Sequence, residues 1–506
     1  MQKGFFLLTS VVVAITGSSV LHAQSEFSLN GYIQNQTGVF FSGEEDEFDA
    51  EGFPSNHGDK RGEFSMFRNT LQLEGDWRPS EKVTLHGIFR GVRSSPLDAD
   101  EYAQVPEPDA VPDPKQWVHD KYYEENEMRE LYLDIDATRR LNFRIGRQQV
   151  TWGDTGQYRL LDVVNPIDGT WHLSTFESFE DTRIPLWIVK GLYDIPALDG
   201  NLEVVWVPAI DEEEDLVTVP LTLVGAWGLP LPPKQEKVSP YTIKKKVFMY
   251  PGDDLEDSRV GVRWKGIIGN LTYTGVYYYT HVISPPIPDY FIHKFRTYDI
   301  DVYLDFPRQQ IAGLSLDYTF NYPIGTVVRL EAAVEPDRTY PVKSSVDPIN
   351  PEKLPNDDMK FYFVRKEKTA VSYALVLSRS TFIRFLNPKE SFMFVAQVFQ
   401  TIIPDFKEED NIIDVPGYDS TEVSQVSTKV ILAVLTNYFR GAIKPVVVGI
   451  YDPGGSAILK GVLNFGIGNH WRVSLGANGI WGEHPYKSIG LFRDRDEVFA
   501  TIRYQF

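Results

Sequence analysis

The sequence predicts an all-β protein: a closed antiparallel transmembrane β-barrel of about 16 strands, within a range of roughly 14 to 18, with one segment folded inward. Three observations predict this fold class. They are an export signal, repeated alternation of apolar and polar residues, and a terminal strand that ends on an aromatic residue. A chain of 506 residues would ordinarily divide into about three soluble domains, but the strand pattern favours one barrel that fills residues 24–506.

The first 23 residues have the features of a secretory signal peptide. Lys3 supplies a positive start, residues 5–15 are almost entirely apolar, and Ala23 precedes a plausible cleavage point. The apolar run is too short to favour an anchoring helix. Residues 1–23 are therefore expected to be removed on export. No later apolar run is long enough for a membrane helix, so a helical membrane protein is excluded.

Apolar residues occupy every second position in one segment after another. In residues 471–478, for example, Trp471, Val473 and Leu475 alternate with polar or small residues. A period of two indicates strands with one apolar face and one polar face. The segments are about 9–14 residues long, which suits tilted membrane strands better than soluble strands of about 5–6 residues. A β-propeller would repeat every 40–50 residues or so, and no such repeat is found.

The C-terminal strand is the sharpest local feature. Its alternating apolar positions finish at Tyr504 and Phe506, and this pattern resembles the terminal strand of bacterial outer-membrane barrels. We expect it to pair with a first strand over residues 27–41 and so to close the barrel. The expected location is the bacterial outer membrane.

Composition excludes several classes of function. The chain has no cysteine, which rules out disulfides, Cys-ligated metals and covalent c-type haem. The formal net charge of −20 argues against nucleic acid as a partner. The nine histidines show no metal-binding spacing, and no nucleophile elbow is found. We therefore expect no cofactor and no enzymatic activity.

Charged residues on the polar face of the predicted strands are expected to face the bore. An Arg or Lys that faces lipid near the midplane costs about 2–4 kcal/mol, so these side chains turn inward. There they either pair to brace the wall or line an aqueous path. Arginine outnumbers acid on these positions, which favours anionic or amphipathic-acid solutes. The candidates for lining the bore include Arg68, Arg90 and Arg263.

Residues 154–185 form a long connection between two good strands, and many of them are apolar. A loop of this length and character is expected to fold into the bore as a constriction or gate. Arg144 and Gln148, on the preceding strand, are offered as partners for its acidic residues. Those acidic residues are Asp162, Asp168, Glu180 and Asp181. An ordered external loop is the alternative interpretation.

The motif G-R-Q-x-x-x-W-G at 146–153 is followed by N-P-I-D at 165–168 and F-E-D-x-R-I-P-L-W at 179–187. Together they resemble an uncharacterised family of large proteobacterial outer-membrane barrels. Members of that family are often found with resistance-nodulation-division exporters and outer-membrane lipoproteins, which implies movement of lipids or hydrophobic compounds. The family has no established catalytic residues, and the resemblance implies a structural or gating role for its motif positions. These are Gly146, Arg147, Gln148, Trp152, Gly153, Asn165, Pro166, Asp181 and Arg183.

The function predicted from the sequence is a porin-like channel or transporter that passes small solutes, hydrophobic or amphipathic ones included, without covalent chemistry. The expected partners are outer-membrane lipid, a small-molecule solute and a periplasmic or exporter protein. Two alternatives stay open. One is a barrel scaffold that sheathes a partner such as a multihaem electron conduit. The other, weaker alternative is an outer-membrane hydrolase.

Overall fold

The fold was analysed in a computed structural model of the chain. The structure describes residues 26–42, 61–94, 124–153, 155, 159–168, 176–208, 227, 242–249, 255–281, 287–294, 299–321, 325–342, 360–363, 365–413, 423–482, 488–493 and 495–506. The expected signal peptide, residues 1–23, lies outside these ranges. None of the helices in the described ranges combines the length and the apolar character that a membrane-crossing helix needs.

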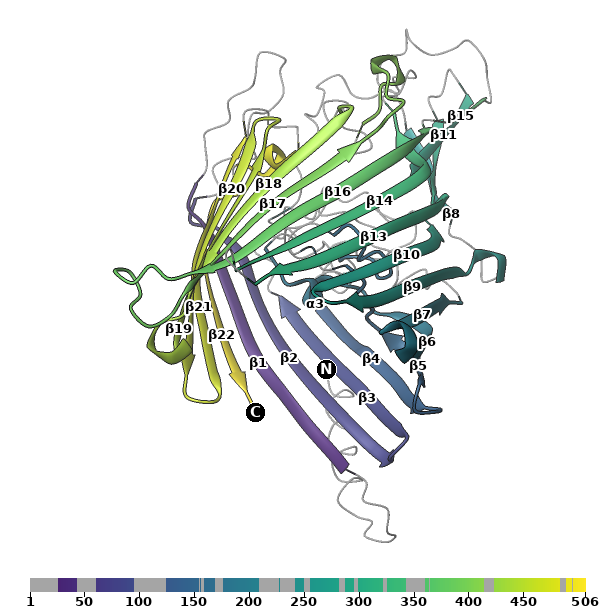
Figure 1. Cartoon of the computed structure of the whole chain (residues 1–506). Coiled ribbons are helices and arrows are strands. Elements are labelled where there is room, and N and C mark those ends of the chain that lie inside the picture. The colour runs from purple at the N-terminus through teal and green to yellow at the C-terminus, as the bar shows by residue number, and fades with distance from the viewer. Residues whose placement is uncertain are drawn as a thin grey trace, which may run out of the picture.

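Within the described residues, 18 strands form one closed antiparallel sheet (Figure 1). Successive strands pair with each other, and the last strand pairs with the first. The strands are β1 (Glu26–Phe40), β2 (Phe64–Ser80), β3 (Val83–Ser94), β4 (Glu124–Asp136), β5 (Leu141–Gln148), β6 (Leu186–Ile195), β7 (Gly200–Val207), β9 (Arg259–Ile268), β10 (Leu271–His281), β13 (Arg308–Phe320), β14 (Thr326–Pro341), β16 (Arg365–Thr381), β17 (Phe392–Ile402), β18 (Val426–Leu435), β19 (Ile443–Asp452), β20 (Ser456–Ile467), β21 (Trp471–Gly482) and β22 (Glu497–Gln505).

The closed antiparallel barrel confirms the predicted fold class, but it has 18 strands rather than about 16. The difference has a physical reason. Strands β5 and β7 have 8 residues each, fewer than the expected length, and the turns that precede them, from β4 to β5 and from β6 to β7, are short. Alternation over so few residues is a weak signal, so adjacent strands merge when they are counted from sequence.

A second sheet of four strands contacts β14 and β16 through β11. The sequence did not predict this sheet. Its strands are β8 (Thr242–Met249), β11 (Ile287–Lys294), β12 (Asp299–Asp305) and β15 (Lys360–Phe363). The short helices in the described ranges are α3 (Phe179–Thr182), η2 (Pro196–Leu198), η3 (Leu255–Asp257), η5 (Glu408–Asp410), η6 (Phe439–Gly441) and η7 (Ser488–Phe492).

The outer face of the barrel is apolar. On β21, Trp471, Leu475 and Trp481 are exposed, and on β22 so are Val498 and Ile502. Such a continuous row of large exposed apolar side chains would be unfavourable in water, and it matches a lipid-facing belt with aromatic residues at its edges. The pairing of β22 with β1 confirms the expected closure by the C-terminal strand.

The two ends of the barrel differ. At one end, short turns connect the strands, such as residues 81–82, 269–270 and 468–470. We call this the short-turn end. Gly269 and Gly468 have φ values of +58° and +60°, which glycine adopts without strain. In outer-membrane barrels short turns face the periplasm. The connection between β5 and β6 leaves the wall at the opposite end.

A charge on the outer face should destabilise the barrel in lipid. The substitution Leu475→Arg is expected to lower the free energy of unfolding by about 2–4 kcal/mol, because Leu475 lies between the two tryptophans of β21 on the lipid face. The measurement is urea unfolding in lipid vesicles, followed by tryptophan fluorescence.

Ser378→Arg on β16 is the control, since Ser378 faces the bore, where a charge meets water, while its neighbour Leu377 is exposed on the lipid face. A much smaller loss is expected for it. Equal losses for the two variants would contradict the assignment of the faces.

Candidate functional site

The chain leaves the barrel wall at Gly146, near the end of β5. Gly146 has φ +139°, and a Cβ there would lie 2.2 Å from the backbone oxygen of Leu131 on β4. Only glycine fits such a position. Gly146, Arg147 and Gln148 are all buried, so the inside–outside alternation of β5 stops there. The chain then enters the bore. We call the described residues of this connection, 149–153, 155, 159–168 and 176–185, the inward segment; the rest of the predicted constriction 154–185 lies outside the described residues.

The first part of the inward segment forms an apolar cluster inside the barrel. Trp152, Leu161 and Val164 are almost completely buried. They pack against inward-facing side chains of β6, β7, β10, β13, β14 and β16. The wall members of this cluster are Leu186, Ile188, Val205, Val207, Val276, Tyr278, Ile311, Ala333 and Ala374. The bore therefore contains a hydrophobic core on this side.

Two glycines of the wall make room for side chains of the inward segment. At Gly261 on β9, a Cβ would lie 2.4 Å from the ring of Trp152. At Gly313 on β13, a Cβ would lie 2.3 Å from Leu161 Cδ2. Any larger residue at either glycine would force the segment to move. Segment and wall are thus complementary in shape although they are far apart in sequence.

Polar contacts add to this packing. Trp152 Nε1 donates to Glu203 on β7, and Glu203 also pairs with Arg263 on β9 at 3.0 Å. The hydroxyl of Thr155 donates to Glu331 on β14 at 3.1 Å. Glu203 and Glu331 are both buried. Buried carboxylates need such partners, because an unpaired charge in the interior is strongly destabilising.

Asp162 and Asn165 connect the beginning of the inward segment to its end. Asp162 is 4% exposed at its side chain and accepts from Arg159 at 3.0 Å and from Arg183 at 2.6 Å. Asn165 accepts from the backbone N–H of Val150 at 2.7 Å and donates to the backbone oxygen of Ile184 at 2.9 Å. Pro166 also accepts from the N–H of residue 184 at 2.9 Å. These contacts join residues within the inward segment, so they stabilise its fold without the wall.

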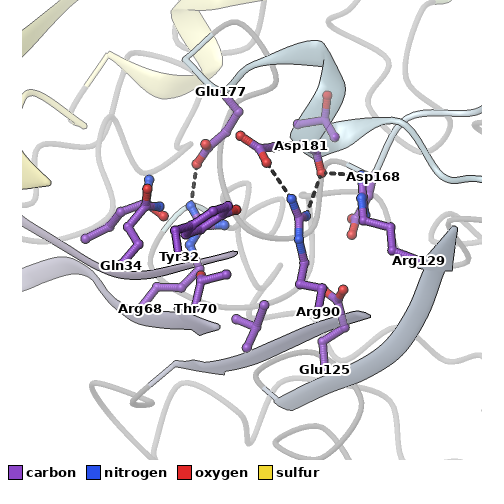
Figure 2. A pocket seen from close by; sticks show the side chains of 13 residues that line it. Tyr32, Gln34, Arg68, Thr70, Arg90, Glu125, Arg129, Asp168, Glu177 and Asp181 are labelled. Carbon is purple, nitrogen blue, oxygen red and sulfur yellow. Dashed lines mark hydrogen bonds and ion pairs between the residues drawn. The ribbon is translucent and has the colours of Figure 1, made fainter. Parts of the chain in front are cut away.

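The second part of the inward segment contacts the other side of the wall. Helix α3 begins after Ser178, whose hydroxyl accepts from the N–H of Asp181 at 3.1 Å. Asp181 forms an ion pair with Arg90 on β3, and Glu177 forms one with Arg68 on β2 (Figure 2). Both arginines were predicted to line the bore, and the structure brings them to α3.

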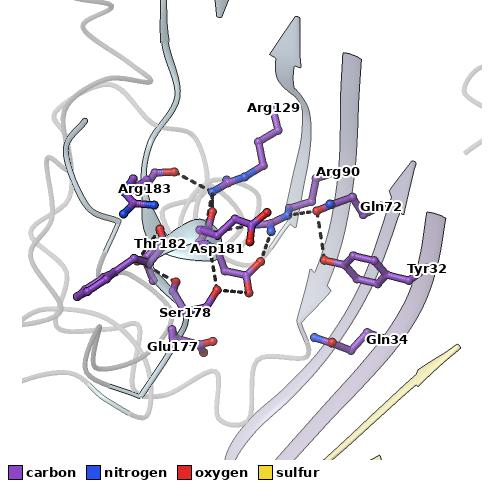
Figure 3. A network of polar contacts seen from close by, with 12 residues as sticks. Tyr32, Gln34, Gln72, Arg90, Arg129, Glu177, Ser178, Asp181, Thr182 and Arg183 are labelled. Carbon is purple, nitrogen blue, oxygen red and sulfur yellow. Dashed lines mark hydrogen bonds and ion pairs between the residues drawn. The ribbon is translucent and has the colours of Figure 1, made fainter. Parts of the chain in front are cut away.

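Arg129 on β4 was missed by the sequence analysis. Its Nη2 donates to the backbone oxygens of Glu180, Asp181 and Arg183 at 2.8, 2.9 and 2.7 Å (Figure 3). These are carbonyl groups at the end of α3, which have no partner within the helix. The register between β3 and β4 shifts at this point and leaves Arg129 out of the pairing. A β-bulge of this kind turns inward a side chain that alternation places outside.

Arg144 and Gln148 do not contact the acidic residues that the sequence analysis offered them. Arg144 binds Asp134 on β4 with two contacts of 2.8 Å, because the two residues lie directly opposite each other in the register. Gln148 donates to backbone oxygens, including that of Ile188 at 3.0 Å. Arg147 pairs with Glu127 at 2.9 Å. The partners of Asp162 and Asp181 are Arg183 and Arg90 instead.

A small polar cavity lies between α3 and the wall (Figure 2). Its volume of about 40 Å³ holds only a few water molecules and no organic solute. It is lined from the wall by residues such as Tyr32, Gln34 and Arg68, and from the inward segment by Glu177 and Asp181. Helix α3 therefore lies close to the wall at this cavity.

A possible metal-ligand set lies on the inner face of β2 and β3. The ligand atoms of Glu74, Asp76 and His86 all lie within 4.8 Å of one another. His86 Nδ1 is 2.8 Å from Asp76 Oδ1, and its ring stacks on Tyr132 with centroids 4.7 Å apart. Two carboxylates and an imidazole could hold a divalent cation. The same contacts equally describe a hydrogen-bonded residue of the wall.

Several solved structures are similar to this chain. They include Salmonella typhi OmpF in complex with daunomycin, with 9% identity, 97% of this chain and 100% of that chain covered, and a TM-score of 0.42. Acinetobacter baumannii OccAB4 has 8% identity, with 95% and 98% covered and a TM-score of 0.47. Pseudomonas aeruginosa OccK5 (OpdH) has 10% identity, with 95% and 98% covered and a TM-score of 0.45.

The apolar outer belt of the closed barrel places the protein in lipid, and a large barrel with an even number of strands is characteristic of the bacterial outer membrane. No protein with a curated description matches the sequence. The model of a family described as "Protein of unknown function (DUF1302)" matches residues 18–506, and the chain therefore belongs to that family.

Proposed function

We propose that the protein is a porin-like channel that passes small solutes, hydrophobic or amphipathic ones included, and that residues 154–185 are its constriction. One observation carries this proposal: the same segment is held to opposite sides of the bore. Thr155 contacts Glu331 on β14, while Asp181 contacts Arg90 on β3, eight strands away around the barrel. On a third side, Lys460 of β20 donates to the backbone oxygen of Phe176 at 2.7 Å. A solute that crosses the barrel must pass this segment.

The two halves of the constriction are held by different forces. Residues around Trp152 and Leu161 lie in an apolar cluster, where each large buried side chain contributes about 1.5–3 kcal/mol. Helix α3 is held by polar contacts, and the side chain of Asp181 is 37% exposed. Because α3 borders a polar cavity, water can replace these contacts when the helix moves, whereas exposure of the apolar half to water would be unfavourable. We therefore propose that α3 moves away from β1–β4 to open the path, while the apolar half stays in place.

Neither alternative gains support from the site. A partner threaded through the barrel, as the scaffold hypothesis requires, would have to displace the packed inward segment. A hydrolase needs a nucleophile beside a general base. Within the described residues, the side-chain hydrogen bonds of His86, His281 and His470 go to a carboxylate or to backbone oxygens. We propose that no covalent step takes place.

The sequence resemblance implies an exporter partner. For this partner we propose only the end of the barrel at which it binds. A periplasmic protein would meet the barrel at the short-turn end, because short turns face the periplasm in outer-membrane barrels. Liposome swelling with sugars, apolar solutes and organic anions would define the solute class of the channel.

Removing the constriction should widen the path. Deletion of residues 160–178 is expected to raise single-channel conductance in planar bilayers several-fold, because it takes away the part of the chain that bridges the bore. The matched control is a deletion within residues 343–358, a Pro- and Asp-rich connection, which should leave conductance near its original value. A folded 160–178 deletion variant with unchanged conductance would refute the role of the segment.

A single substitution tests the proposed movement of α3. Arg129→Met removes a donor to three backbone oxygens at the end of α3. The oxygens of Glu180 and Asp181 keep Gln149 and Arg90 as donors, whereas that of Arg183 loses its donor, and a buried unsatisfied carbonyl costs about 1–3 kcal/mol. The closed position of α3 should become less stable. Single-channel recordings are expected to show more frequent openings to a higher conductance.

Arg144→Met provides the comparison for this variant. Arg144 is also an inward-facing arginine, on the neighbouring strand β5, but its ion pair is with Asp134 of the wall. It should leave the opening frequency unchanged. If both variants alter gating alike, the effect belongs to the charge of the bore and not to α3.

A further inference from the structure

Most arginines of the bore have a carboxylate partner. Arg144 pairs with Asp134, Arg263 with Glu203 and Arg329 with Asp317. Four cations at the short-turn end differ from this pattern, since none of them forms an ion pair with a carboxylate anywhere in the described part of the chain. They are Arg440, Lys444, Arg472 and Arg503.

These four cations line one cavity of about 590 Å³. Its other polar side chains are neutral: Gln34, Asn464, Ser474 and Thr501. No acidic residue is among the described residues that line it. The volume is in the range of small-molecule sites, about 300–1,000 Å³. The cavity is therefore large enough for an organic solute and carries only positive charge.

The strand register concentrates this charge. Arg472 on β21 and Arg503 on β22 lie directly opposite each other. Like charges in this position repel and destabilise a sheet. Both side chains face the bore, because their neighbours Trp471 and Ile502 are on the lipid face. An anion bound between the two arginines would remove the repulsion.

The turn that carries Arg440 is strained. Phe439 and Arg440 have φ values of +52° and +60°, a region that non-glycine residues rarely adopt. Two such residues in succession store conformational energy, which is typical of functional sites. Lys444 follows directly on β19 and lies opposite Asn464 of β20. The turn and the strand together bring two of the four cations to the cavity.

A chain of polar contacts connects this cavity to the constriction. Arg503 Nε donates to Gln34 at 2.6 Å, and its guanidinium lies 4.1 Å from the ring centre of Tyr32. Gln34 lines both this cavity and the small cavity beside α3. The Tyr32 hydroxyl donates to Gln72, which also accepts from Arg90, the ion-pair partner of Asp181 on α3 (Figure 3).

We propose that this cavity binds the anionic group of a small organic acid on its way through the barrel. The inference rests on the proposed channel function and names its substrate class: solutes with a carboxylate, sulfonate or phosphate group. The anion sits between Arg472, Arg503 and Lys444, next to the polar chain that leads to α3. A membrane lipid is not the occupant, because these side chains face the bore rather than the bilayer.

The test uses citrate as the probe and the purified full-length protein in detergent. Isothermal titration calorimetry at low ionic strength should detect citrate binding, and raising the salt concentration should weaken it. The variant Lys444→Gln/Arg472→Gln is expected to bind about tenfold more weakly, since two charged contacts are lost. Arg440→Gln, in the turn, should give a smaller loss. Sucrose, a neutral solute, should not bind.

The matched control is Arg139→Gln/Arg140→Gln, which removes the same charge from a turn at the same end but outside the cavity. It should bind citrate as the original protein does. Heat-modifiable migration on gels confirms that each variant is folded. Absent citrate binding, or equal weakening in the control, would overturn the inference. Single-channel conductance of the same samples is the separate readout of the proposed channel, so either proposal can fail while the other holds.

Discussion

A charged side chain in a membrane-spanning strand must face the bore, and this constraint determines the interior of the barrel. Each strand presents an apolar side to lipid, so its charged residues accumulate in the bore. There a buried charge needs a partner. The pairs Arg144–Asp134 and Arg329–Asp317 meet this need within the wall itself. Arg68 and Arg90 meet it with residues of the inward segment.

The inward segment is complementary to both the apolar and the charged parts of the wall. Where the wall is apolar, glycines at 261 and 313 make room for Trp152 and Leu161, and the contact resembles the core of a soluble protein. Where the wall is charged, α3 and the preceding Glu177 offer carboxylates and carbonyl groups to three arginines. One segment therefore combines a fixed side with a hydrated side. That asymmetry is what makes a moving constriction physically reasonable.

Much of this fold could be predicted from the sequence, because alternation and lipid exposure are directly connected. The closing strand up to Phe506 and the inward direction of Arg68, Arg90 and Arg263 follow from a period of two. Arg129 could not be found in this way, because a bulge breaks the period at its position. The only signal was the succession of two charged residues, Arg129 and Glu130, within one strand. The partners of Arg144 and Gln148 depend on register across strands, which no local pattern records.

The order in which the chain is made has a consequence for how this barrel must be assembled. The apolar side of the inward segment, around Leu161, is covered by Ile311, Ala333 and Ala374, which are synthesised well over a hundred residues later. Contacts so distant in sequence form slowly. Until β13, β14 and β16 are in place, the apolar side chains around Leu161 lack their native contacts. At that stage the first and last strands are also still unpaired. Burial of this segment and closure of the barrel are therefore coupled late steps of folding.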